Sequence, residues 1–198
     1  MNTPNKLTLA RMIATPIFMA VMLINFDYHY LIACILFMAA SLTDFIDGKM
    51  ARKNNMVTDF GKFMDPLADK MLTTSAYLGF MYIYGGTEYA WHIVAITFIV
   101  LFREFAVSSI RLVAVTAGGK VVAANMWGKL KTVSQMFGLV FALAVFAVAE
   151  IAPEAFTIGT FDTLNTIIII LFWLSAVLCV ISGGIYIWGG RDFIKNAK

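Results

Sequence analysis

Four aspartates between residues 44 and 69 have the types and spacing that could bind metal ions. Asp44 and Asp47 are three residues apart and Asp65 and Asp69 are four apart, so each pair lies on one face of a helix. Without cations, such closely spaced negative charges would repel one another strongly. Hard divalent cations such as Mg²⁺ or Mn²⁺ prefer oxygen ligands and remove that conflict. Because four carboxylates exceed what one Mg²⁺ usually takes from protein, the pattern favours a two-metal site around a phosphorus atom.

Small residues and one arginine are interleaved with these aspartates. Gly48, Ala51 and Gly61 leave room for the backbone to approach a bulky or flat group. Arg52 offers a planar fork of donors suited to phosphate. Taken alone, Gly61 fits a close helix–helix contact in a membrane equally well. A solvated acidic loop, however, would not need paired helical spacing with interleaved glycines.

The rest of the chain is apolar enough to be a membrane protein. Of its 198 residues 61% are hydrophobic and only 14% are charged, which excludes an ordinary soluble domain. Since a helix of about 20 residues crosses a bilayer, the long apolar runs predict six transmembrane helices. The runs fall at about 12–26, 28–46, 67–84, 90–117, 132–152 and 164–189. We therefore expect an all-α membrane protein with one integral membrane catalytic domain over residues 1–198.

Two local signals predict where helices start near the ends of these runs. Thr3-Pro4 suits a helix start, and the following NKLTLAR predicts a short helix at the membrane interface before the first span. A frayed polar terminus explains that pattern equally well. Asp65-Pro66 predicts the cap and first position of the third span, after a polar connection over about 49–62.

Lysine and arginine are absent from the connections near 27–29, 85–89 and 152–163 and gather at the opposite helix ends. By the positive-inside rule, both termini and the acidic motif are predicted to be cytoplasmic. Cys34 and Cys179 stand singly in separate apolar runs, which predicts small core residues and no disulfide framework.

Two arginines in the fourth apolar run predict a second anion-binding pocket. Arg103 and Arg111 are eight residues apart and so share roughly one helix face, and arginine within a span is costly unless it faces a cavity or partner. Together with Lys131 they could bind a phosphate on an acceptor molecule. A simple ion pair between Arg103 and Glu104 is the structural alternative.

Residues 44–69 match D-x2-D-G-x2-A-R-x8-G-x3-D-x3-D at every specified position, and the chain in this respect resembles the CDP-alcohol phosphotransferases. The resemblance implies six membrane helices around a polar cavity and transfer of a phosphoalcohol group from a CDP-linked donor, with release of CMP. It also implies two metal ions, a homodimer and no nucleic-acid partner. Asp44, Asp47, Asp65 and Asp69 would bind the metals, with Asp69 also the general base. The CDP site would be lined by Gly48, Ala51, Arg52, Thr58, Gly61 and Asn5.

The segments REFAVSSIR and VVAANMWGKLKT resemble the branch of this family that makes phosphatidylglycerol phosphate. That branch implies CDP-diacylglycerol as donor, sn-glycerol 3-phosphate as acceptor and the bacterial inner membrane as location. An inositol phosphate acceptor also stays open. A divalent-cation carrier is a distant alternative, because the carboxylates cluster near one membrane boundary and not at the midplane. A structural scaffold would leave the buried charges unexplained.

Overall fold

The computed structural model describes residues 3–53, 59–116 and 126–196, with side chains except at 3–4, 44–53, 59–63, 112–116, 158 and 190–196. No strand occurs in the described ranges, so the predicted all-α class is confirmed. The helices are α1 (Thr3–Leu23), α2 (His29–Lys53), α3 (Asp59–Ile83), α4 (Ala90–Thr116), α5 (Met126–Ile151), the 3₁₀ turn η1 (Pro153–Ala155) and α6 (Ile158–Asn196).

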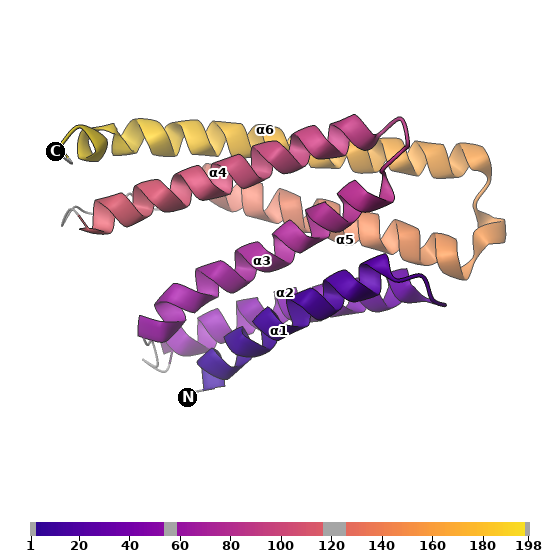
Figure 1. Cartoon of the computed structure of the whole chain (residues 1–198), viewed down its shortest axis with the longest axis horizontal. Coiled ribbons are helices and arrows are strands. Elements are labelled where there is room, and N and C mark those ends of the chain that lie inside the picture. The colour runs from indigo at the N-terminus through magenta and orange to yellow at the C-terminus, as the bar shows by residue number, and fades with distance from the viewer. Residues whose placement is uncertain (1–2, 54–58, 117–125, 197–198) are drawn as a thin grey trace.

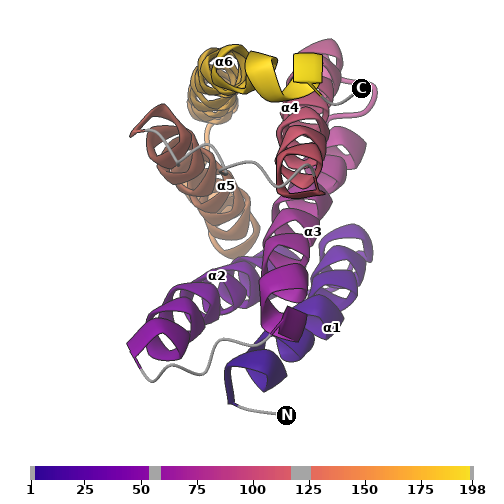
Figure 2. The same ribbon diagram turned by 90° about the vertical axis from the view of Figure 1, so that its left-hand side faces the viewer.

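The six α-helices form a closed ring in the order α1, α2, α5, α6, α4 and α3, and α3 completes the ring by packing on α1. The helix α3 also contacts α2 and α5 across the ring. Figure 1 shows both termini, the end of α2 and the start of α3 at one end of the bundle, on the left. Figure 2 shows the ring from this end, which we call the terminal end; the loop end is the opposite one.

Four of the helices are long and apolar enough to cross a membrane. These stretches are Asn5–Leu23, Ala90–Arg111, Met126–Ile151 and Gly159–Gly189, and α2 contributes a shorter apolar stretch, His29–Thr43. The helix α3 is not among them in the described part of the chain, and it carries Asp65, Asp69 and Lys70 in its first half. An integral membrane protein is thus supported, whereas the predicted count of six spans is not confirmed.

The continuation of the first helix and the start of the third differ from the sequence prediction. The helix α1 begins at Thr3 as predicted but continues unbroken to Leu23, with Pro16 inside it, so no separate interfacial helix precedes the span. The helix α3 begins at Asp59 and contains Pro66, so the prediction that Asp65-Pro66 starts this helix is wrong. Proline removes one i→i−4 hydrogen bond, and here that loss does not end the helix.

The helix α1 buries polar residues and exposes apolar ones at the terminal end. Its buried face carries Asn5, Thr8, Arg11 and Thr15, which recur every three or four residues. Ile13 and Ile17 are half-exposed on the outside. This inversion suits a helix with lipid outside and polar chemistry inside the ring.

Aromatic packing fills the ring beyond the polar region. The Phe172 ring lies 5.3 Å from Tyr77 and 5.5 Å from Phe80 between ring centroids, both edge-on. Phe80 in turn lies 6.0 Å from Phe146. Such edge-to-face pairs add stability beyond the area they bury. They join α3, α5 and α6 in the middle of the ring and so hold these three helices in place relative to one another.

At the loop end, a carboxylate from α5 caps the start of α2. The Glu150 oxygens accept hydrogen bonds from the backbone N–H groups of His29 and Tyr30, both at 3.0 Å. The preceding residue, Tyr28, has a φ of 64°, which is strained for a residue with a side chain. Glu150 therefore holds a tight turn into α2 and links it to α5.

We expect Glu150→Ala to destabilise the fold by about 1–2 kcal/mol, because the first N–H groups of α2 lose their acceptor. Thermal unfolding of the purified protein in detergent measures this, with the exposed Glu154→Ala as the matched control. Equal midpoints for the two variants would show that the cap contributes nothing.

Candidate functional site

Asp65 is fixed between α1 and α3 at the terminal end. Its Oδ1 accepts a hydrogen bond of 2.5 Å from the Thr8 hydroxyl of α1, and the Asp65 side chain is partly buried. Thr8 itself is 1% exposed, so the bond lies within the protein. This contact orients the carboxylate of Asp65 and uses one of its several acceptor positions.

Asp69 lies one helical turn further along α3 and lines a small pocket of about 20 Å³. The pocket is formed by α3, α4 and α5, and its lining includes Lys70, Glu104 and Lys131. The structure therefore brings the last aspartate of the acidic motif into one pocket with Lys131, one of the three residues predicted to bind the acceptor.

Glu104 is the centre of a group of charged side chains from three helices. Its carboxylate accepts hydrogen bonds from Lys131 of α5 and from Arg103 of α4, the latter at 3.1 Å, and lies 3.9 Å from the Lys70 ammonium of α3. Lys70 also donates to the Ser108 hydroxyl. We call Lys70, Arg103, Glu104 and Lys131 the Glu104 cluster.

The Glu104 cluster keeps an excess of positive charge. It holds three cations and one carboxylate, so its formal net charge is +2. The positive charges of Arg103, Arg111 and Lys131 repel the Lys70 ammonium, whereas Glu104 attracts it. Because the Glu104, Arg103 and Lys131 side chains are only 9–15% exposed, this excess is poorly screened and favours an anion such as a phosphate monoester.

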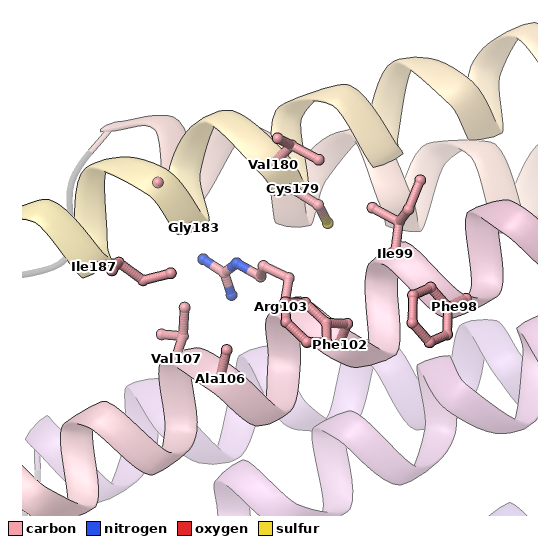
Figure 3. Close-up of a pocket in the computed structure, with 11 residues that line it drawn as sticks. Phe98, Ile99, Phe102, Arg103, Ala106, Val107, Cys179, Val180, Gly183 and Ile187 are labelled. Atoms are coloured by element: carbon pink, nitrogen blue, oxygen red, sulfur yellow. The ribbon is translucent and has the colours of Figure 1, made fainter.

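Arg103 reaches this position along a glycine of α6. Figure 3 shows its side chain extending from α4 toward Gly183, and a Cβ at Gly183 would lie 3.0 Å from the Arg103 Cγ. A second guanidinium nitrogen donates to the Ser182 hydroxyl at 3.2 Å. The aliphatic part of Arg103 borders an apolar pocket of about 290 Å³ between α4 and α6. The predicted Arg103–Glu104 ion pair exists, but it is one contact in a larger cluster.

Arg111 is placed apart from the direct contacts of the Glu104 cluster. Its guanidinium carbon lies 5.9 Å from the centroid of the Tyr186 ring on α6, a cation–π arrangement, and its side chain is exposed. The structure thus brings Arg103 and Lys131 together on Glu104, whereas Arg111 contributes through its longer-range charge.

Several predicted residues have no described side chain. Asp44, Asp47, Gly48, Ala51 and Arg52 belong to the last turns of α2, and Gly61 belongs to the start of α3. Thr58 lies outside the described residues. Asn5, the looser candidate for the CDP site, is 7% exposed on α1, on the same buried face as Thr8.

The donor set fits a hard divalent cation. Among the residues whose side chains are described, no group of three or more histidines, cysteines, aspartates or glutamates could hold a metal ion. Asp65 and Asp69, however, stand one turn apart on α3, and the end of α2 that carries Asp44 and Asp47 lies at the same end of the bundle (Figure 1). Oxygen donors of this kind match the preference of Mg²⁺ or Mn²⁺.

The sequence interpretation missed two contributors to this region. Lys70 directly follows the last aspartate, but it is not one of the positions that the motif specifies. Thr8 belongs to the buried polar face of α1. The sequence interpretation placed this segment in a short helix at the membrane interface. The signal of this face was the polar spacing Asn5, Thr8, Arg11 and Thr15 within an apolar run. Polar residues at helical spacing in a span indicate a protein-facing side.

Replacement of Glu104 should destabilise the protein, because three cations then lose the negative charge that they share. We expect Glu104→Gln, which removes the charge and keeps the shape, to cost about 3 kcal/mol, the lower end for a broken buried pair since Lys70 is 34% exposed. Thermal unfolding in detergent measures the loss. The exposed Glu88→Gln is the control and should leave the midpoint unchanged. A midpoint for Glu104→Gln that equals the control's would contradict a structural role for the cluster.

Comparison with known proteins places this site in a family context. The family model described as CDP-alcohol phosphatidyltransferase matches residues 1–188. A relative from Bacillus subtilis (strain 168), named CDP-diacylglycerol--glycerol-3-phosphate 3-phosphatidyltransferase, is 42% identical and the match covers 100% of this chain and 99% of the relative. A relative of the same name from Rickettsia bellii is 33% identical, and the match covers 93% of this chain and 93% of the relative. Another from Pseudomonas fluorescens is 29% identical, and the match covers 100% of this chain and 90% of the relative.

Proposed function

The chain belongs to the CDP-alcohol phosphatidyltransferase family, and from that premise we propose that it transfers the phosphatidyl group of CDP-diacylglycerol to sn-glycerol 3-phosphate. The products are phosphatidylglycerol phosphate and CMP. The observation that carries this proposal is the position of Asp69 in one pocket with Lys70 and Lys131 of the Glu104 cluster. A base and a phosphate-binding group beside each other are what an acceptor with a hydroxyl and a phosphate requires.

The acidic motif would bind the donor's pyrophosphate through metal ions. Asp44, Asp47, Asp65 and Asp69 would hold two ions, Mg²⁺ or Mn²⁺, consistent with the general divalent-metal dependence of the family. When bound, such ions neutralise charge on the pyrophosphate and on the departing CMP. The hydrogen bond from Thr8 keeps the Asp65 carboxylate oriented toward this task. Gly48, Ala51, Arg52, Thr58, Gly61 and Asn5 remain our candidates for the contacts with CDP.

The Glu104 cluster would bind the acceptor. Its excess of two positive charges matches the phosphate of glycerol 3-phosphate, which is close to a dianion at neutral pH. Arg103, Lys131 and Lys70 would contact that phosphate directly, with Arg111 adding its longer-range charge. An acceptor without phosphate would leave the cluster uncompensated, which disfavours simple alcohols, while inositol phosphate shares the required group.

Asp69 would start the reaction as the general base. Its carboxylate takes the proton from the 1-hydroxyl of the acceptor, and that oxygen attacks the β-phosphorus of CDP-diacylglycerol. The bond between the β-phosphorus and the oxygen that bridges it to the α-phosphorus breaks, and its electron pair leaves with CMP.

The setting that this chemistry requires is a cytoplasmic membrane surface. We propose that all six α-helices cross the bacterial inner membrane, with both termini and the site on the cytoplasmic side. The excess of lysine and arginine at the terminal end supports this orientation. A homodimer is the assembly expected from the family resemblance.

The reaction is tested by CMP release from the purified protein in detergent with CDP-diacylglycerol and Mg²⁺. We expect release only when both the metal ion and glycerol 3-phosphate are present. Inositol phosphate, serine and no acceptor are the comparison arms. Release with one of these but not with glycerol 3-phosphate would overturn the acceptor assignment, and metal uptake into vesicles without CMP release would favour the carrier.

Asp69→Asn should abolish turnover, since an amide cannot accept the proton. We expect CMP release to fall about a hundred- to ten-thousand-fold, the usual contribution of a general base. Thermal unfolding should stay near that of the unmodified protein. The exposed Asp162→Asn at the loop end serves as control and should retain full activity. Near-normal activity of the Asp69 variant in a folded state would refute its role as base.

A further inference from the structure

The pocket beside Asp69 is small and lined by polar side chains from three helices. Its volume is about 20 Å³, which is room for a water-sized polar group. Asp69 comes from α3, Glu104 from α4, and Lys131 and Gln135 from α5. Hydroxyl groups of a small molecule could reach the residues of this pocket, while its phosphate would lie outside it.

Gln135 is the polar residue of this pocket that the proposed mechanism does not use. It stands one turn beyond Lys131 on α5 and is 3% exposed. Its side chain lies near the Tyr77 hydroxyl, which is itself 3.1 Å from the Ser175 hydroxyl. Even so, the amide nitrogen Nε2 is buried without a hydrogen-bond partner among the described residues.

An unsatisfied buried amide has a cost that a ligand can remove. Leaving such a donor without a partner costs about 1–3 kcal/mol, so buried amides are normally paired. An amide carries both donors and an acceptor, and a hydroxyl can donate and accept, so a hydroxyl satisfies Gln135 whichever way the amide is turned. The amide is neutral, so its natural partner is a neutral group of the ligand, such as a hydroxyl, and not the phosphate.

We propose that Gln135 hydrogen-bonds the second hydroxyl of the acceptor, the one that does not react, and thereby makes the enzyme select a vicinal diol phosphate. This inference rests on the proposed function, in which Asp69 takes the proton of the 1-hydroxyl and the Glu104 cluster binds the phosphate. In glycerol 3-phosphate the 2-hydroxyl lies between those two groups, as Gln135 lies in one pocket with Asp69 and Lys131.

The test compares two acceptors that differ only in that hydroxyl. The kcat/KM for CMP release is measured with sn-glycerol 3-phosphate and with 3-hydroxypropyl phosphate, for the unmodified protein and for Gln135→Met, which keeps the length of the side chain. We expect the preference for glycerol 3-phosphate to fall about tenfold in the variant, equivalent to about 1.4 kcal/mol. The ratio of the two values within one preparation does not depend on the fraction of folded protein.

The control is another buried amide outside the pocket. Asn165, 5% exposed, accepts a hydrogen bond of 2.8 Å from Tyr84 at the loop end, so Asn165→Leu should lower stability and leave the acceptor preference unchanged. Gln135→Asn, which keeps an amide but shortens it, should also reduce the preference and covers the case in which Gln135→Met does not fold.

Equal losses with both acceptors would show that Gln135 has only a structural role, and an unmodified protein that uses both acceptors equally would likewise overturn the proposal. These outcomes differ from failure of the proposed function itself, in which the unmodified protein releases no CMP with glycerol 3-phosphate.

Discussion

The contact of Glu104 with three cations is the constraint that organises the terminal end of this bundle. Lys70, Arg103 and Lys131 come from α3, α4 and α5, and all three lie within salt-bridge distance of the one carboxylate. In a chain that is 61% hydrophobic, such charges are costly to bury unless they are paired. Helices α3, α4 and α5 must therefore meet at this point, and the incomplete neutralisation of their charges leaves a place for an anion.

Other contacts support this arrangement from the flanks. Gly183 of α6 leaves space for the aliphatic part of Arg103, and Thr8 of α1 holds Asp65 by a short hydrogen bond. The aromatic contacts among Tyr77, Phe80 and Phe172 fix the same helices farther along the ring. The bundle thus combines a tightly packed apolar part with a polar terminal end. The packed part sets helix positions, so that the polar residues of different helices converge.

Two kinds of anion recognition would then operate side by side. The acidic motif repels phosphates unless metal ions are bound, whereas the Glu104 cluster attracts them directly. Asp69 lies where these two regions meet, since it belongs to the motif and also lines the pocket with Glu104 and Lys131. This position explains how one carboxylate could serve both the donor and the acceptor in a single displacement.

The sequence by itself determined the all-α class, the family and the acidic motif, because these depend on composition and on spacing along single helices. It also predicted that Arg103 and Lys131 act together, since charge within a span indicates function, and the structure brings both side chains to Glu104. Only the tertiary structure decided that Glu104 joins them to Lys70, that Arg111 faces Tyr186, and that α3 continues through Pro66. The contact of Thr8 with Asp65 and the burial of the Gln135 amide also emerged only from the packing of the ring. These features depend on which faces of different helices meet, and spacing within one helix does not contain that information.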